Sequence, residues 1–291
     1  MHQVSQNERK NGWINGFIGM LIFSGSLPAT KAAVLGFDPL FLTAARATIA
    51  GLLSLAMLLL YKEKLPTQRQ WISLTVVSLG VVVGFPLLTA IALQEMTSAH
   101  SLVFLALLPL STAIFAVIRG GEKPRPIFWL FSILGSLLVM GYAISQGGTS
   151  SLSANILMIA SVIVCGLGYA EGATLTKALG GWQVICWALI VSLPVMLILT
   201  IILIPVSFNV ISTSAWVGLG YVSIFSMLIG FIFWYKGLSQ GGIAAVGQLQ
   251  LLQPFFGLAL AATLLNESVN MIMLLVTIGV IFCVAGSRKY A

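Results

Sequence analysis

Ionisable side chains are rare inside the long apolar runs of this chain, and those found there are the first candidates for chemistry. Arg46, His100 and Glu171 each stand within such a run. A charged group in a membrane-crossing helix is expensive, so it usually serves a substrate path, an ion path or a partner charge. The sequence therefore identifies these three residues as candidates for binding a substrate or coupling its movement to an ion.

Glu171, in LGYAEGATLTK, stands seven residues before the end of its expected helix, roughly 10 Å from that end at 1.5 Å per residue. A carboxyl group at this depth suits uptake and release of a proton near neutral pH. The alternative is a structural carboxylate that is tied to a neighbouring helix or reaches the inner interface. Both interpretations stay open at this point.

Arg46 is expected roughly 10 Å from the outer start of its helix. In a hydrocarbon core of ~30 Å, Arg46 and Glu171 would then lie about 10 Å apart along the membrane normal, too far for a direct ion pair. We favour a structural role for Arg46, as an anchor of the second helix. His100 is expected near the outer end of its helix, as an interface residue, with a proton relay as the alternative.

Three glutamines, Gln248, Gln250 and Gln253, interrupt another apolar run. Gln250 and Gln253 share a helix face, whereas Gln248 is turned by roughly 200° from Gln250, so the three side chains do not line one cavity. The expected depth of Gln248 matches that of Glu171 and predicts a hydrogen bond between the sixth and ninth helices. Interhelical packing is the alternative role for these amides.

Two prolines and two aromatic residues complete the set of candidates. Pro109 and Pro254 fall in the middle of apolar runs, where proline kinks a helix and leaves a backbone carbonyl free. Such a carbonyl is available to a cavity. Tyr169 and Trp234 are candidates for the wall of that cavity.

Composition determines the class of protein. Of 291 residues, 59% are hydrophobic and 7% are charged, and the mean hydropathy is +1.06, which leaves too little polar surface for a soluble globule. The net charge of +7 is spread in small groups beside apolar runs, as in the cytoplasmic loops of membrane proteins. We therefore predict an all-α, multi-pass membrane protein with no nucleic-acid partner.

Ten membrane-crossing helices follow from the apolar runs and their turn signals. The expected spans are 13–33, 39–61, 71–93, 98–118, 127–145, 154–178, 182–203, 215–235, 243–265 and 271–285. With both termini in the cytoplasm, twelve of the fourteen basic residues face the cytoplasm, in agreement with the positive-inside rule.

An internal duplication is predicted by a shift of 145 positions. The shift places Pro254 on Pro109 and Glu267 on Glu122, two residue types that are rare here. Five helices per half is an odd number, so the second half would cross the membrane in the opposite direction to the first. The expected five-helix repeats are residues 1–147 and 148–291.

These paired segments also resemble a known family. ALQEMTSAHSLVFLALLPLSTAIFAVIRGGEKP and WYKGLSQGGIAAVGQLQLLQPFFGLALAATLLNES are similar to the fourth and ninth helices of EamA-type members of the drug/metabolite transporter superfamily. Arg46, in LTAARATIAGLL, resembles an arginine often found in the second helix of these proteins. Asn266 departs from the glycine that often precedes the closing glutamate, which the first half has as Gly121.

The resemblance implies a carrier in the bacterial inner membrane, often an exporter, with a substrate cavity between its halves. We expect a secondary transporter for a small organic metabolite such as an amino acid, with proton coupling through Glu171. A carrier for cationic drugs and a non-transporting receptor or scaffold are the alternatives. No metal or cofactor is expected, and the absence of a metalloprotease, P-loop or carboxylate-pair motif argues against an enzyme.

Overall fold

The chain is helical, and its computed structural model describes residues 6–145, 147, 150–207, 211–257 and 271–291. No strand occurs in these ranges. The helices of the first half are α1 (Gln6–Ser24), α2 (Ser26–Val34), α3 (Pro39–Leu60), α4 (Gln68–Val77), η1 (Ser78–Gly84), α5 (Phe85–Glu95), α6 (Ser98–Leu105), α7 (Leu108–Ile118) and α8 (Pro126–Ser145). Those of the second half are α9 (Leu152–Leu179), α10 (Gly181–Ile202), α11 (Thr213–Gly220), η2 (Tyr221–Ile229), α12 (Gly230–Gly241), α13 (Ile243–Gly247), η3 (Gln248–Leu252) and α15 (Met271–Tyr290).

Eight helical stretches in the described part are long and apolar enough to cross a membrane. They are Gln6–Val34, Pro39–Leu60, Gln68–Glu95, His100–Ile118, Pro126–Ser145, Leu152–Leu179, Gly181–Ile202 and Thr213–Gly241. These eight coincide with the first eight predicted spans. The predicted ninth span extends past residue 257 into 258–265, which lie outside the described residues, as do Asn266 and Glu267.

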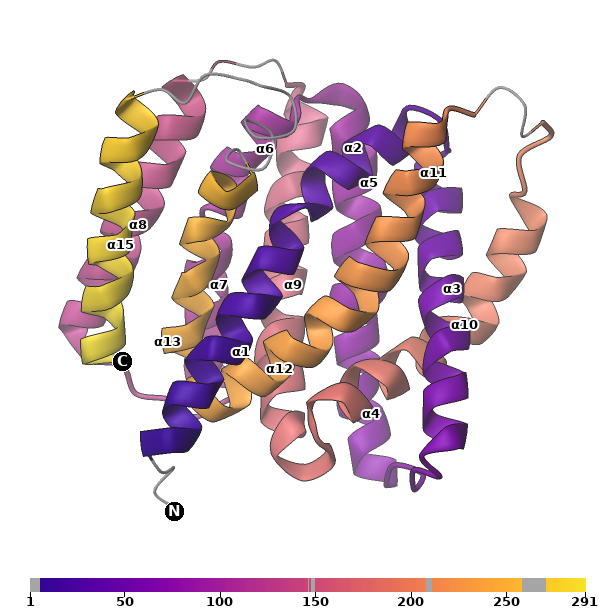
Figure 1. Cartoon of the computed structure of the whole chain (residues 1–291), viewed down its shortest axis with the longest axis horizontal. Helices are drawn as coiled ribbons and strands as arrows, with labels where there is room; N and C mark the ends of the chain where they lie inside the picture. Colours follow the sequence, from indigo (N-terminus) through magenta and orange to yellow (C-terminus); the bar gives the residue numbers. More distant parts are fainter. Residues whose placement is uncertain (1–5, 146, 148–149, 208–210, 258–270) are drawn as a thin grey trace.

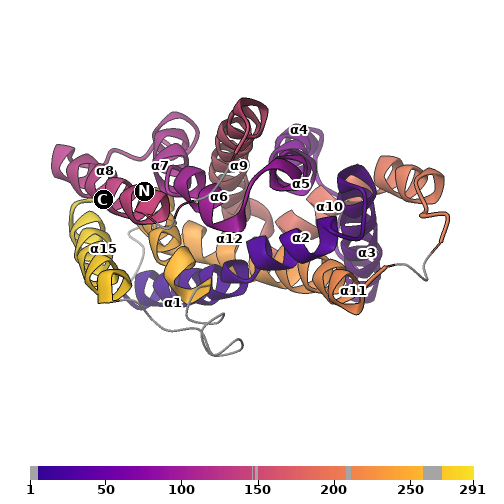
Figure 2. The same cartoon turned by 90° about the horizontal axis from the view of Figure 1, so that it is seen from above.

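The helices form a bundle that is elongated when seen from above (Figure 2). At one end of the long axis α8 packs against α15, and at the other end α3 packs against α10. The start of α1 and the end of α15, which are nearest to the chain termini, lie toward the same end of the helices (Figure 1). This end is called the termini end below.

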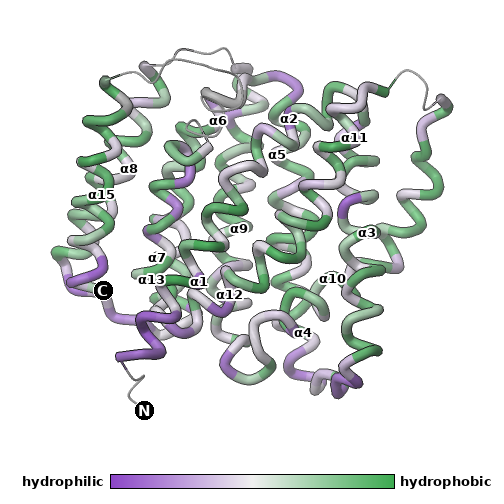
Figure 3. The backbone as a smooth tube through the Cα atoms, in the orientation of Figure 1, coloured by the Kyte–Doolittle hydropathy of each residue, from purple (hydrophilic) through white to green (hydrophobic). Residues whose placement is uncertain are grey.

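The outer surface of the bundle is apolar along the helices and hydrophilic at their ends (Figure 3). Apolar colour covers the length of the helices, and hydrophilic colour gathers at their ends (Figure 3). Large apolar side chains such as Leu59, Ile133 and Ile198 are exposed, as expected of side chains that face lipid rather than water. The buried face of α3 is instead built from small residues, including Ala44 and Ala47, so that neighbouring helices approach closely.

One close contact of this kind lies between α1 and α12. A methyl group added at Gly237 would come within 2.5 Å of the backbone nitrogen of Gly16, and one added at Gly12 within 2.4 Å of that of Gly241. The two backbones therefore touch without intervening side chains. Glycines spaced four apart on each helix make this approach available.

Two kinds of helix irregularity recur in the two halves. π-helical segments occur at η1 and η2, and the residues 145 positions after η1, 223–229, all lie within η2. A second irregularity is the break after Leu105, where α7 begins next to Pro109; about 145 positions later lies the 3₁₀ segment η3, just before Pro254. Proline lacks the N–H that a continuous helix needs at such a point.

Candidate functional site

A narrow central cavity of about 30 Å³ lies among helices from both halves. Apolar and aromatic side chains form most of its wall, and hydroxyl groups, one amide and one guanidinium provide its polar groups. The residues that line it are Phe23, Ser26, Leu27, Thr30, Arg46, Val81, Phe85, Pro86, Thr89, Leu105, Leu108, Tyr169, Ser226, Phe231 and Gln253.

Arg46 is the only charged side chain among the described residues that line the cavity. It comes from α3, whose start is fixed by Pro39 and by Asp38, which accepts hydrogen bonds from Leu40 N at 2.8 Å and Phe41 N at 3.2 Å. Arg46 is 5% exposed, and its Nε has no hydrogen-bond partner. Glu171 pairs elsewhere, so the expectation that it does not bind Arg46 directly agrees with this geometry.

Tyr169 lies on the cavity wall, in the middle of a cluster of aromatic side chains. Its ring packs 5.5 Å from that of Trp234 and 5.9 Å from that of Phe231. Trp234 is fully buried and lies behind Tyr169, outside the set of lining residues. Of the two aromatic candidates, Tyr169 therefore faces the cavity and Trp234 supports it.

The three glutamines contact three different elements. Gln250 Nε2 donates to Tyr169 Oη at 3.1 Å, and Gln253 Nε2 donates to the carbonyl of Phe23 at 3.0 Å. Gln248 lies 3.5 Å from the carbonyl oxygen of Pro109 on α7. The amide that links the sixth and ninth predicted spans is thus that of Gln250.

The prediction that Gln248 makes this link was wrong. Residues 248–252 form a 3₁₀ helix, in which each residue turns by about 120° rather than 100°, so α-helical spacing misplaces the side chains. The amide of Gln248 approaches the carbonyl of Pro109 itself, whereas the carbonyl that a proline leaves free is the one four residues earlier in the chain. Neither Pro109 nor Pro254 lines the cavity itself.

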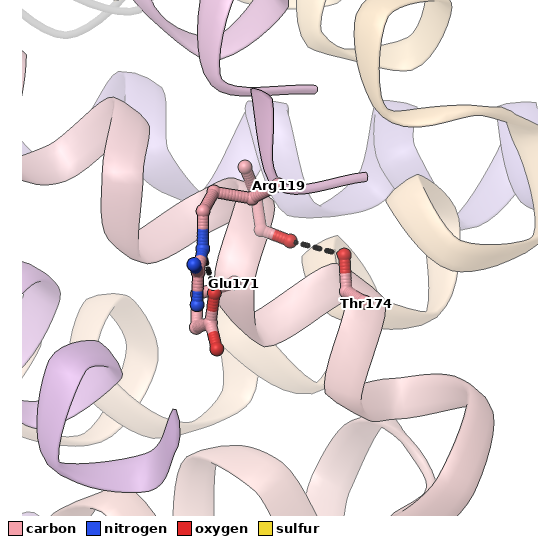
Figure 4. A network of polar contacts seen from close by, with 4 residues as sticks. Arg119, Glu171 and Thr174 are labelled. Carbon is pink, nitrogen blue, oxygen red and sulfur yellow. Dashed lines mark hydrogen bonds and ion pairs between the residues drawn. The ribbon is translucent and has the colours of Figure 1, made fainter. Parts of the chain in front are cut away.

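Glu171 lies outside the central cavity, although it is on the same helix as Tyr169. Its carboxylate accepts a hydrogen bond from Arg119 Nε at 2.7 Å, with the Glu171 side chain 6% and the Arg119 side chain 48% exposed. Figure 4 shows the guanidinium lying against the carboxylate, one turn away from Thr174, whose hydroxyl donates to the carbonyl of Ala170. The carboxylate raises the pKa of Arg119 through this bond, so Arg119 stays charged.

The ion pair lies in a hollow that is open to solvent and is lined also by Arg69, Gln70 and Ser73, at the start of α4. It connects the end of α7 in the first half to α9 in the second. Spacing in the sequence indicated the depth of Glu171 but did not identify Arg119 as its partner, because their proximity depends on the packing of α7 against α9.

His100 is far from this pair and from the cavity lining. Its Nε2 is within 3.0 Å of Ser150 Oγ, and its ring lies 5.9 Å from that of Phe104. It begins a membrane-crossing stretch, which agrees with an interface position.

Two further contacts between the halves were missed from the sequence. Glu122 accepts hydrogen bonds from Ile243 N at 2.6 Å and Ala244 N at 2.8 Å, and so caps the start of α13. Ser26 Oγ donates to Ser226 Oγ at 2.8 Å at the cavity wall. The alignment of Glu122 with Glu267 at a shift of 145 positions was the sequence feature that could have indicated the Glu122 contact. No sequence feature indicates the contact between Ser26 and Ser226.

The described residues contain no candidate metal-binding site. They hold no cluster of three or more His, Cys, Asp or Glu side chains that could bind a metal ion. The three cysteines, Cys165, Cys186 and Cys283, are free and buried.

Comparisons with known proteins agree on one family. The model of the EamA-like transporter family matches residues 10–143 and again 152–288. The chain is 62% identical over 285 residues to the uncharacterized transporter YdeK of Bacillus subtilis, covering 98% of this chain and 99% of that protein. An uncharacterized transporter of Archaeoglobus fulgidus is 25% identical over 283 residues, with 92% of each chain covered.

A solved crystal structure has the same fold, with a TM-score of 0.80 over 97% of this chain and 100% of the other at 18% identity. At that identity the likeness concerns the fold alone. The family match covers nearly the whole chain in two consecutive segments. This protein is a member of the EamA-like transporter family.

Proposed function

We propose that the protein is a secondary-active exporter of a small organic metabolite, such as an amino acid or a related compound. The observation that carries the proposal is the central cavity, which is enclosed by helices of both halves and is lined by apolar walls with a few polar groups. Cavities of this composition are typical of small-molecule sites. A site between two halves is also where alternating access operates.

The proposed architecture is ten helices in two inverted repeats, 1–147 and 148–291. Three pairs of cavity-lining residues support it, because their members stand 145 positions apart. The pairs are Val81 with Ser226, Pro86 with Phe231, and Leu108 with Gln253. Equivalent positions on the two repeats thus meet at one cavity, and the π-helical segments η1 and η2 that supply the first pair also correspond.

The proposed orientation places both termini in the cytoplasm of a bacterial cell. The excess of basic residues in the segments expected on that side supports it. The position of the start of α1 and the end of α15 at one end of the bundle is compatible with an even number of crossings (Figure 1). The hollow that holds Arg119 and Glu171 then opens to the cytoplasm.

Proton coupling through Glu171 is part of the proposal. The ion pair with Arg119 joins the two halves at the termini end, so it must break if that end opens. Protonation of the carboxylate removes the charge on which the pair depends. The proton gradient can therefore bias the conformational equilibrium, because the two conformations hold the proton differently.

Counterflow in proteoliposomes tests the proposed function. Vesicles loaded with an unlabelled mixture of amino acids should accumulate labelled amino acid from outside, while vesicles without protein should not. Ser226→Phe places a large side chain in the cavity and should abolish the exchange. Ile224→Phe, two residues away at a position 37% exposed on the lipid-facing side, is the matched control and should keep it.

Two results would contradict the proposal. One is equal counterflow in the Ser226→Phe and parent proteins, which would place the path elsewhere. The other is the absence of exchange with amino acids and with a wider panel of organic acids, amines and sugars, which would favour a receptor or scaffold. The absence of any acidic residue among the described lining residues makes cationic drugs the less favoured substrates.

A further inference from the structure

The buried guanidinium of Arg46 is a charge for which the described residues supply no counterion. The side chain is 5% exposed and faces the central cavity. It takes part in no salt bridge within the described ranges, and its Nε has no hydrogen-bond partner. A buried charge without a partner is strongly unfavourable, so a structural anchor would be expected to have one.

A second polar group in the same cavity is also unpartnered. Thr89, on α5, is 2% exposed, and its hydroxyl oxygen has no hydrogen-bond partner. Thr89 and Arg46 both line the cavity, and their helices α3 and α5 pack against each other. Two unsatisfied groups on adjacent walls, one cationic and one a hydroxyl, fit an oxygen-rich anion.

Charge balance selects the kind of anion. One guanidinium neutralises one negative charge, and its planar fork binds both oxygens of a carboxylate side by side. A phosphate dianion would leave a net negative charge in an apolar cavity, whereas an amine would add a second positive charge to Arg46. The cavity therefore suits a ligand with a single carboxylate group.

We propose that Arg46 binds the carboxylate of the transported substrate, with Thr89 as a second donor. The substrate is a monocarboxylate. A zwitterionic amino acid also qualifies, because its carboxylate can pair with Arg46 while its ammonium group lies over the aromatic rings of the cavity. This inference rests on the proposed transport function and specifies its substrate class. The hydroxyl of Tyr169 and the rings of Phe23 and Phe231, which also line the cavity, are suited to an ammonium or apolar group on the same substrate.

Thermal stabilisation of the purified protein in detergent tests the assignment without the need for transport. The probes are a pool of neutral amino acids, the matching pool of amino-acid amides, and a pool of monocarboxylates without an amino group. We expect the two carboxylate-bearing pools to raise the melting temperature by roughly 2–4 °C. The amides, which keep the side chain and amino group but lack the carboxylate, should have no effect.

Two variants link this effect to Arg46. Arg46→Gln should bind the carboxylate pools roughly ten- to hundredfold more weakly, and Arg46→Lys, which keeps the charge without the fork, should recover part of the affinity. Thr48→Ala is the control, because Thr48 lies on the same helix but bonds to Thr200 at 3.0 Å. If Arg46→Gln does not fold, protection of Arg46 from phenylglyoxal by the carboxylate pools in the parent protein gives the same information.

The inference is overturned if the amides stabilise the parent protein as well as the amino acids do, if no carboxylate pool stabilises it, or if Arg46→Gln retains full carboxylate binding. Failure of the proposed function has a different signature. Carboxylates would then bind in an Arg46-dependent way and yet show no counterflow in proteoliposomes.

Discussion

Removal of the carboxylate charge by Glu171→Gln should open the termini end of the protein. Glu171 and Arg119 are 2.7 Å apart, with one side chain buried and the other half exposed. Fully exposed pairs contribute about 0–1 kcal/mol, and disruption of a fully buried pair costs about 3–5 kcal/mol. For this half-exposed pair we expect its loss to change the free-energy difference between the closed and open conformations by about 1 kcal/mol. The population of the open conformation then rises roughly fivefold.

Cysteine labelling measures that shift. Leu175 lines the hollow beside the pair and is 9% exposed, so Leu175→Cys in a background without native cysteines should react slowly with a maleimide. Glu171→Gln should raise its labelling rate roughly fivefold. Acidic pH should raise the rate in the parent, taken relative to that of a free thiol at the same pH, because Arg119 remains protonated and the carboxylate is the group that changes charge.

The control is Glu95→Gln, a carboxylate at which Ser151 and Ser153 donate hydrogen bonds and which forms no salt bridge with the described residues. This variant should leave labelling at Leu175→Cys unchanged. In Arg119→Gln/Glu171→Gln the two effects should not add, because each single change removes the same bond. Unchanged labelling in Glu171→Gln, or full additivity in the double variant, would refute the reasoning.

Of three further predictions, two concern contacts between the halves and one concerns a contact within the second half. Gly237→Ala should lower the stability of the folded protein by about 1–3 kcal/mol, since its methyl group would meet the backbone of Gly16; a melting temperature equal to the parent's would show that α1 and α12 separate easily. Glu122→Ala should lower the free energy of unfolding by about 1–2 kcal/mol, because it removes the two hydrogen bonds at the start of α13. Glu122→Gln should have an intermediate stability in the same denaturation measurements. Equal stability of the parent and both variants would contradict the capping role. Tyr169→Phe should weaken substrate binding in a counterflow assay, because Gln250 loses its hydrogen-bond partner at the cavity wall. Tyr142→Phe is the control, at a buried tyrosine outside the cavity lining, and should leave substrate binding unchanged.

Much of the helical framework could be predicted because lipid imposes a simple requirement on sequence. Each crossing needs about 20 apolar residues, and the first eight predicted spans coincide with the helical stretches of the structure. The breaks within helices were harder. Pro109 indicated a kink, but not that α6 would end at Leu105 and a new helix begin at Leu108.

The site was less predictable, because it depends on which helices pack together. Hydropathy and spacing gave the depth of Arg46 and Glu171 but not their partners. The sequence favoured an anchor role for Arg46 and left Glu171 open between a proton carrier and a carboxylate tied to a neighbouring helix. In the structure Glu171 is paired with Arg119, and Arg46 forms no salt bridge among the described residues. The 3₁₀ geometry at Gln248 could not be inferred from residue types alone.

The π-helical segments η1 and η2 have a consequence for the history of the chain. A π-helical turn is most simply explained as one residue inserted into an α-helix. On the proposed duplication, the corresponding positions of η1 and η2 place that insertion in the ancestral five-helix unit, before the gene was doubled. Deletion of one residue within Ser78–Gly84 would then undo an old event, and would turn the remainder of that helix, which carries Pro86 and Thr89, by about 100° away from the cavity.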